Sequence, residues 1–308
     1  GSILSLAPQR MQDAISDDAK AGLLEAELEA GLRVRHPPVV LLAGVCQELL
    51  ASPALKAPYQ NDKRAPAEKA RALERRALVS LEGIKLERAA QQGGKAEGKE
   101  REAYLARIDA LLESLFEAAT LFQSLQDRGG LARVALEAGE ALTWRAVLSL
   151  DPSWTPAASE AASSALRILH AASSTPSPPG GADGGGPSRA AKGRAAAHAR
   201  MLADLVALHG QPVLARAAVS AAVALLSQQE TADEAKGGES EAGDAQQLLL
   251  TITLASSFGL PLAARSALEA CQAPASANLR RLRGVAEGAV AAAEGGGEEA
   301  MRLLAEAW

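Results

Sequence analysis

The chain has 308 residues, of which 48% are hydrophobic but only 3% aromatic, and its formal net charge is −5 at pH 7. Acidic and basic residues are interspersed along it, which disfavours the basic face that a nucleic-acid-binding domain usually needs. It has no apolar run of roughly 18 residues and no β-branched run of period two, so we predict neither a membrane span nor a strand. Ala, Leu and Val dominate its apolar residues and suit closely packed helices, and the predicted fold class is all-α.

Apolar residues at helical spacing predict six helices in residues 1–172. The second predicted helix, PVVLLAGVCQELLAS (38–52), is apolar on nearly every side, which is typical of a buried helix. Pro66 is well placed as the first-turn proline of the third. The segment QDRGG (126–130) is expected to end the fourth helix, and Leu131 to open the fifth. The predicted ranges are 9–33, 38–52, 66–92, 99 to about 125, 131–150 and 157–172.

Two polar segments interrupt the C-terminal half. SSTPSPPGGADGGGPS (173–188) has one Ala as its only apolar residue and cannot offset the entropy of ordering, so it predicts a disordered insertion. Residues 228–244 predict an acidic loop. Both segments are expected to be loops between helices of one array, and linkers between domains are the alternative. The expected organisation is an N-terminal helical part (1–172), the insertion, and C-terminal repeats (189–308). The helices predicted in these repeats are 190–208, 212–228, 245–258, 261–273, 277–293 and 297–307.

One thirteen-residue segment occurs in two similar copies in the C-terminal part. GQPVLARAAVSAA (210–222) and GLPLAARSALEAC (259–271) match without a gap at six of thirteen positions. Gly210 and Gly259 each follow an apolar segment, where a left-handed residue can end a helix at little cost. Pro212 and Pro261 follow two residues later and fit the start of the next helix. The repeat therefore predicts two antiparallel helix hairpins with the same hinge.

Weaker copies of the segment are LARVALEA (131–138) and EEAMRLLAEA (298–307). Each copy places a large apolar residue four positions after a small one, in the pairs Ala215 and Val219, Ala264 and Leu268, Ala132 and Leu136, and Ala300 and Leu304. This spacing resembles the second-helix signature of the tetratricopeptide repeat family, over about residues 100–149 and 190–308. Of the first-helix signature, the chain keeps Glu287-Gly288. The resemblance implies a right-handed superhelix of antiparallel helix pairs, an α-solenoid of about eleven or twelve helices.

The sequence holds no recognisable catalytic, metal or cofactor site. Its four histidines have no metal-pair spacing, and Cys46 and Cys271 sit in apolar helical patterns that predict buried thiols. GGADGGGP lacks the Lys-Ser/Thr and the preceding strand of a phosphate loop. We therefore expect no catalysis, no cofactor and no metal.

Four residues are candidates for contact with a partner. Arg133, Arg216 and Arg265 each follow the repeated alanine, so a regular stack would align them on one face. They are either a strip for an acidic partner, or solvated arginines whose stems cover neighbouring helices. Trp154, between Pro152 and Pro156, is the candidate exposed anchor.

These features favour a non-catalytic protein-interaction scaffold or adaptor, a domain of a larger protein or a subunit of a complex, that binds a peptide or helical segment. An RNA-binding helical-repeat protein is the alternative, disfavoured by the pI near 5.6 and the lack of a repeated base-reading code. An all-α enzyme built on scattered residues is the third reading. We expect a cytoplasmic or nuclear protein. Gly1-Ser2 reads as a cloning remnant, so organelle targeting stays open, as does the oligomeric state.

Overall fold

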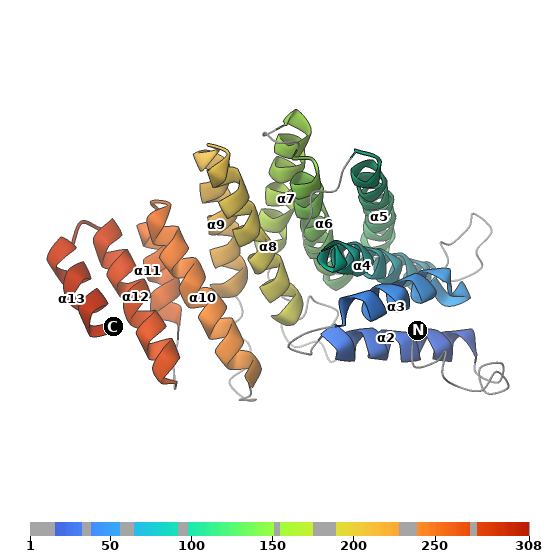
Figure 1. Cartoon of the computed structure of the whole chain (residues 1–308), viewed down its shortest axis with the longest axis horizontal. Coiled ribbons are helices and arrows are strands. Elements are labelled where there is room, and N and C mark those ends of the chain that lie inside the picture. Colours follow the sequence, from blue (N-terminus) through green and yellow to red (C-terminus); the bar gives the residue numbers. More distant parts are fainter. Residues whose placement is uncertain are drawn as a thin grey trace. The chain divides into compact units, whose positions relative to one another are not determined.

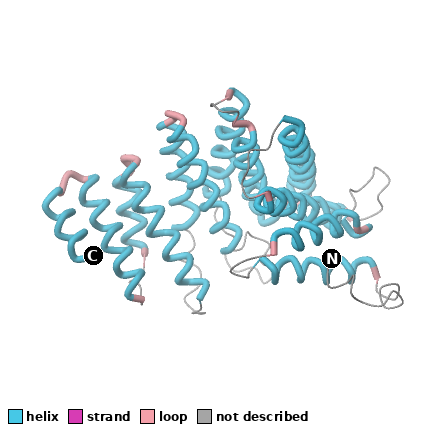
Figure 2. The backbone as a smooth tube through the Cα atoms, viewed as in Figure 1, coloured by secondary structure: helices cyan, strands magenta, loops and turns pink. Residues whose placement is uncertain are grey.

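The computed structural model describes residues 16–32, 38–55, 65–91, 98–150, 155–174, 189–227, 239–271 and 276–307. Within these ranges the regular structure is entirely helical, with twelve α-helices (α2 to α13) and the short 3₁₀ helix η2 (Figures 1 and 2). Helices contact mainly their neighbours in sequence. The all-α prediction is thus confirmed. The chain forms two compact units, which divide inside α6 between Val134 and Ala135.

The first unit is a series of helices that pack in chain order, α2 on α3, α3 on α4 and α4 on α5. Its apolar core gathers Leu28 of α2, Leu42 and Leu49 of α3, and Leu86 of α4, all buried. Each helix stabilises the next by burying one apolar stripe against it. The elements are α2 (Asp17–Leu32), α3 (Val39–Ala51), η2 (Pro53–Leu55), α4 (Pro66–Ala90), α5 (Gly98–Ser124) and the start of α6 (Arg128–Leu148).

Helix α3 is less buried than its sequence predicts. Leu42 and Val45 are buried, but Val40 is 73% and Leu41 37% exposed. The helix packs on α2, η2 and α4, which together cover one side of it. Apolar residues at its N-terminal end remain exposed, so the prediction of a buried helix is confirmed for one side of α3 and wrong for the other.

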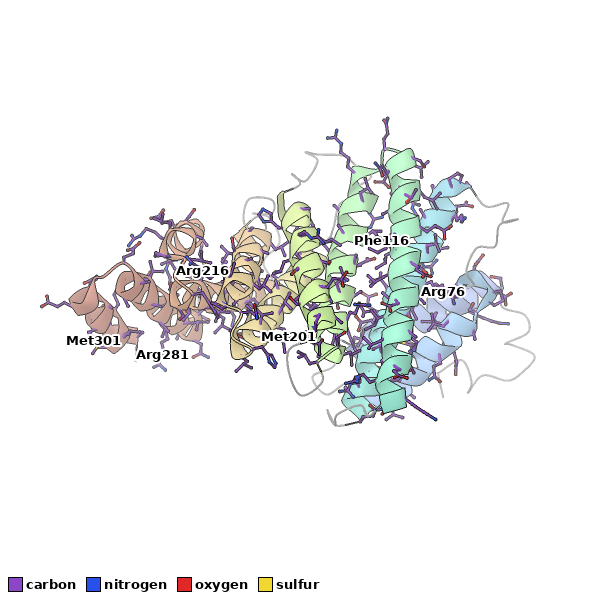
Figure 3. All side chains as sticks on the ribbon, turned by 90° about the horizontal axis from the view of Figure 1, so that it is seen from above. Arg76, Phe116, Met201, Arg216, Arg281 and Met301 are labelled. Carbon is purple, nitrogen blue, oxygen red and sulfur yellow. The ribbon has the colours of Figure 1, made fainter. Side chains whose placement is uncertain are left out.

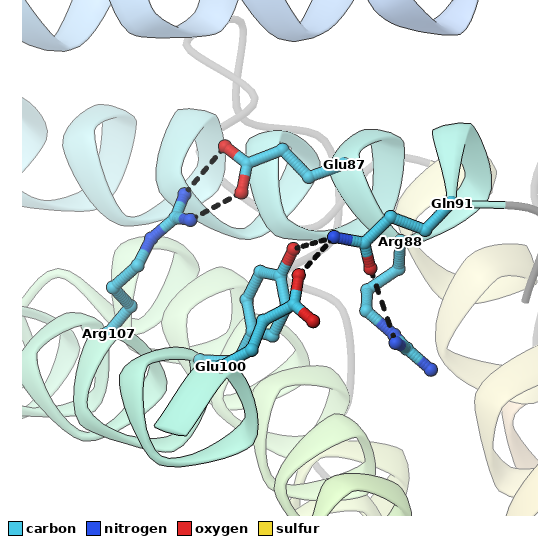
Figure 4. Close-up of polar contacts among 6 residues, drawn as sticks. Glu87, Arg88, Gln91, Glu100 and Arg107 are labelled. Carbon is cyan, nitrogen blue, oxygen red and sulfur yellow. Dashed lines mark hydrogen bonds and ion pairs between the residues drawn. The ribbon is translucent and has the colours of Figure 1, made fainter. Parts of the chain in front are cut away.

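Polar contacts join the C-terminal end of α4 to α5 (Figure 4). Arg107 of α5 donates to Glu87 of α4 with an Nη1–Oε2 distance of 2.5 Å. Gln91 donates to the Tyr104 hydroxyl at 3.2 Å and also to Glu100. The guanidinium of Arg107 lies 5.7 Å from the centroid of the Tyr104 ring, within cation–π range. Burial, with smaller contributions from Glu87 and Glu100, raises the pKa of Tyr104 above its ordinary value.

The second unit continues from Ala135 with the rest of α6. Figure 1 shows α8 to α13 following one another in chain order. The pairs α8–α9 and α12–α13 share the largest contacts, and α7–α9, α9–α11 and α10–α12 also pack. Each of the helices α7 to α10 therefore contacts both its next and its next-but-one neighbour. The helices are α7 (Pro156–Ser174), α8 (Arg189–Leu208), α9 (Pro212–Ser227), α10 (Glu239–Ser257), α11 (Pro261–Ala270), α12 (Ala277–Ala293) and α13 (Gly297–Ala307).

Four predicted helix boundaries differ from the structure by three residues or more. Helix α2 begins at Asp17 instead of residue 9, and predicted residues 9–15 lie outside the described residues. Helix α11 ends at Ala270 instead of residue 273.

Helix α10 begins at Glu239 instead of residue 245, because Glu and Ala support a helix as readily as an acidic loop. Helix α6 begins at Arg128, so Gly129 and Gly130 lie inside it instead of ending α5. The predicted insertion overlaps α7 at residues 173–174 and otherwise lies largely outside the described residues, as does the acidic loop before Glu239.

The glycine hinges are confirmed. Gly210 and Gly259 both have φ of +71°, and α9 and α11 begin two residues later at Pro212 and Pro261. Gly210 N–H donates to Ala207 O at 3.0 Å, and the next residue, Gln211, donates to Val206 O at 2.8 Å. This pair of bonds is a Schellman motif, which satisfies carbonyls at the end of α8.

The same motif recurs at Gly259, at Gly295 (φ +90°) and at Gln126 (φ +55°), the residue that joins α5 to α6. In every case the next helix begins two residues after the left-handed one. Four helix connections, one in the first unit and three in the second, therefore share one backbone geometry.

This geometry sets which residues are equivalent. Ala215, Ala264 and Ala300 each lie five residues after a hinge glycine, and all three are buried. The residue five positions after Gln126 is Leu131, so Ala132 lies one position out of register and is half-buried. Leu136 is buried but displaced by the same step. Val219 and Leu268 are equivalent buried residues one turn on, and Leu304 of α13 is half-buried.

Other glycines allow neighbouring helices to pack closely against each other. A Cβ on Gly130 would lie 2.5 Å from the Phe122 ring, and a Cβ on Gly288 would lie 2.7 Å from Leu304 Cγ. Both glycines are inside helices, at positions where their neighbours leave no room for a methyl group. Gly288 thus lets α12 pack directly on α13.

We predict that Gly210→Ala lowers the free energy of unfolding by about 1–2 kcal/mol, because a Cβ is strained at positive φ. A Cβ at Gly210 would meet no heavy atom within 4 Å, so backbone strain alone is tested. Gly210→Asn is the matched control and should lose less, since Asn tolerates this conformation. Urea unfolding measures both, and an unchanged stability of Gly210→Ala would contradict the left-handed hinge.

We also predict that Gly288→Ala lowers the free energy of unfolding by about 1–3 kcal/mol through overpacking against Leu304. Leu304→Ala removes the atoms that the new methyl group meets, so the double variant should lose less than the sum of the two single changes. A double-mutant cycle by urea unfolding measures this coupling. Strict additivity would show that the two residues do not touch.

Candidate functional site

Arg133 is held inside the first unit. Its Nε donates to Glu74 Oε1 of α4 at 2.7 Å, and its guanidinium lies 5.7 Å from the centroid of the Phe122 ring. Glu74 is 6% exposed, so this pair fixes a buried carboxylate. The charge of Arg133 is neutralised within its own unit.

Arg216 and Arg265 are equivalent, since each lies six residues after a hinge glycine. Each contacts the hinge of the following hairpin. Arg216 Nη2 donates to Gly259 O at 3.0 Å, and Arg265 Nε donates to Glu294 Oε1 at 2.5 Å, beside Gly295. The hydrogen bond from Arg265 lowers the pKa of the Glu294 carboxyl.

The equivalent position in α13 holds Met301, which is 70% exposed. Figure 3 shows both Arg216 and Met301 with their side chains drawn as sticks. The expected row of arginines therefore has two equivalent members in the described part of the second unit, and Arg133 is bound elsewhere. Trp154 lies outside the described residues.

Both cysteines are free and buried, as predicted. Burial, more than the nearby carboxylates of Glu82 and Glu87, raises the pKa of the Cys46 thiol to about 12. At neutral pH this thiol is protonated and therefore a poor nucleophile. Among the residues that the structure describes, no group of three or more His, Cys, Asp or Glu is placed to hold a metal ion.

The interior of the second unit contains ionisable side chains from α6 and α8. His198 Nδ1 lies 2.7 Å from the Arg194 carbonyl, and its Nε2 lies 3.3 Å from Glu140 Oε1. Glu140 is 5% and Lys192 8% exposed, and burial lowers the pKa of Lys192. Glu140 and His198 are 58 positions apart in the sequence, so no local pattern marks their contact. Because His198 and Glu140 contact each other, they link the two helices.

A depression at the α12–α13 hinge is lined by Gly295, Gly296, Gly297, Glu298, Glu299 and Arg302. Arg302 forms ion pairs with Glu299 at 2.5 Å and with Glu306 at 2.6 Å. Its charge is already matched by these neighbours, so the depression offers no spare cation to an anionic ligand.

Among the described residues of the second unit, the most exposed large aliphatic side chains lie beside the hinges at Gly210 and Gly259, which the bond from Arg216 to Gly259 O joins. Leu208, Val213 and Leu262 are 85%, 78% and 81% exposed. Val213 and Leu262 are equivalent, each three residues after its hinge glycine, and Leu208 lies two residues before Gly210. We call Leu208, Val213, Arg216 and Leu262 together the hinge surface. The two copies of the repeat already align Val213 with Leu262, but that alignment does not reveal their exposure.

No described helix has the length and apolar character that crossing a membrane requires. No protein-family model matches the chain, and no curated protein sequence matches it.

We predict that neither cysteine reacts measurably with a thiol reagent in the native protein at pH 8. Cys46 is fully buried with a raised pKa, and Cys271 is 5% exposed. Both should react at once in denaturant. Rapid labelling of Cys46 in the native protein, located by mass spectrometry, would contradict the packing of α3 against α4.

Proposed function

We propose that the chain is a non-catalytic protein-interaction scaffold and that the hinge surface binds a segment of a partner protein. One observation carries the proposal, namely the three aliphatic side chains, 78–85% exposed, on two adjoining hinges. Burying a Val or Leu side chain is worth about 1.5–3 kcal/mol. Such residues on a soluble protein favour a contact surface when they are grouped.

The hinge surface is also held rigidly. The first-turn prolines Pro212 and Pro261 fix φ next to Val213 and Leu262, and two backbone hydrogen bonds close each glycine hinge. The bond from Arg216 to Gly259 O joins the two hinges. A surface that is ordered before binding loses little conformational entropy on binding, which supports a docking role.

In this proposal, the hairpins in residues 189–308 form a divergent tetratricopeptide-like array, a right-handed superhelix. Three features support it: the shared hinge geometry at Gly210, Gly259 and Gly295, the next-but-one packing of helices, and the equivalent burial of Ala215 and Ala264. The close approach of Gly288 to Leu304 matches the tight pairing of helices within such a repeat. The chain would then act inside the cell, as a domain of a larger protein or a subunit of a complex.

Site-specific photo-crosslinking in the source cells tests this function. A photoreactive amino acid at Val213 or at Leu262 should yield one defined protein adduct, found by mass spectrometry. Asn278 is the control site, because it is exposed at the start of α12, at the opposite end of that helix from the Gly295 hinge. Label at Asn278 should not yield the same adduct.

The variant Leu208→Ser/Val213→Ser/Leu262→Ser separates binding from folding. Its midpoint of thermal unfolding should stay close to that of the parent, because the three side chains are exposed. With the photoreactive residue moved to Ala217, an exposed neighbour on α9, the adduct should form in the parent and disappear in the variant. An adduct that persists would contradict a role for the hinge surface, and a nucleic-acid adduct would favour the RNA-binding alternative.

A further inference from the structure

We propose that the partner segment presents a carboxylate to Arg216, between apolar side chains that cover Val213 and Leu262. This inference rests on the proposed function and adds the chemistry of the partner. It predicts an acidic residue flanked by aliphatic ones in the bound segment.

The position of Arg216 connects the two hinges that carry Val213 and Leu262. Val213 and Arg216 are three residues apart on α9 and therefore share a face of that helix. The Arg216 guanidinium reaches Gly259 O at 3.0 Å, and Leu262 follows Gly259 by three residues. The Arg216 side chain therefore starts one helical turn after Val213, and its guanidinium lies at the Gly259 hinge, next to which Leu262 is found.

Arg216 differs from Arg133 and Arg265 in the groups that its guanidinium contacts. Among the described residues, the structure gives its side chain one hydrogen bond, to a neutral carbonyl. A guanidinium has five N–H donors, so most of them are available to a ligand. Arg133 and Arg265, by contrast, are each neutralised by a carboxylate, from Glu74 and Glu294. Arg216 is therefore the member of the predicted row that fits an acidic partner.

The flanking residues favour a polypeptide over other anions. Val213 and Leu262 flank Arg216, so the complementary ligand has apolar side chains on both sides of its carboxylate. A nucleic acid would instead seek aromatic platforms for its bases, and the four residues of the hinge surface include none. Once the apolar flanks exclude water, the bond between guanidinium and carboxylate is strengthened.

Fluorescence anisotropy with the full chain tests the inference, using three short peptides that place Glu, Gln or Lys between two Leu residues. We expect the Glu peptide to bind about tenfold more tightly than the Gln peptide, as for a hydrogen bond to a charged group. Arg216→Gln should abolish this difference, and Arg216→Glu should shift the preference to the Lys peptide. Arg281→Gln is the control, because Arg281 is exposed in the first turns of α12, far from the Gly295 hinge, and it should change nothing.

Two results would overturn the inference and leave the proposed function standing. In the first, the Glu and Gln peptides bind equally, and both lose affinity in Val213→Ser/Leu262→Ser. In the second, no peptide binds, but photo-crosslinking at Val213 still yields its protein adduct. If Val213→Ser/Leu262→Ser keeps the affinity of the parent and the crosslinked adduct is also absent, both proposals fail.

Discussion

Much of the second unit depends on a single left-handed glycine at each of three described helix connections. At Gly210, Gly259 and Gly295, positive φ reverses the chain, and two hydrogen bonds close the end of the preceding helix. The next helix begins two residues later, so its buried face is fixed from its first turn. Ala215, at the fifth position after its glycine, is buried for this reason, and so are its equivalents in α11 and α13.

The hinge also determines which side chains of the next helix are exposed to solvent. Position three after the glycine faces solvent, which leaves Val213 and Leu262 exposed. Position six carries an arginine long enough to reach the following hinge, through Gly259 O for Arg216 and through Glu294 for Arg265. Packing and surface therefore follow from the same backbone geometry. The interaction surface that we propose is a consequence of how the hairpins are connected.

Much of the fold is predictable from the sequence, because local rules decide it. Apolar periodicity predicted all twelve described helices, and the Gly-x-Pro phrase predicted the hinges at Gly210 and Gly259. The Gly129–Gly130 pair led to a wrong prediction of where α5 ends, because glycine can serve either a helix end or close packing inside a helix. At Gly259 it permits positive φ, whereas at Gly130 it leaves room for the Phe122 ring, and the left-handed residue of that connection is Gln126.

The candidate site was less predictable, because exposure and pairing are tertiary properties. The spacing placed Arg133 with the two equivalent arginines, but Glu74, 59 residues earlier, binds it. The apolar character of Val40 suggested burial, and only the arrangement of neighbouring helices leaves it in solvent. Leu262 looks the same in sequence whether it faces a core or water. Such differences depend on which helices meet, which periodicity alone does not encode.

Amide hydrogen exchange at the hinges tests the central claim most directly. In the native protein, the N–H groups of Gly210, Gly259 and Gly295 and of the residue after each donate to carbonyls of the preceding helix. All six should therefore be protected, and to a similar degree, as expected for equivalent connections. Exchange at these amides as fast as in an unfolded chain, or protection at one hinge and not at the others, would contradict the account.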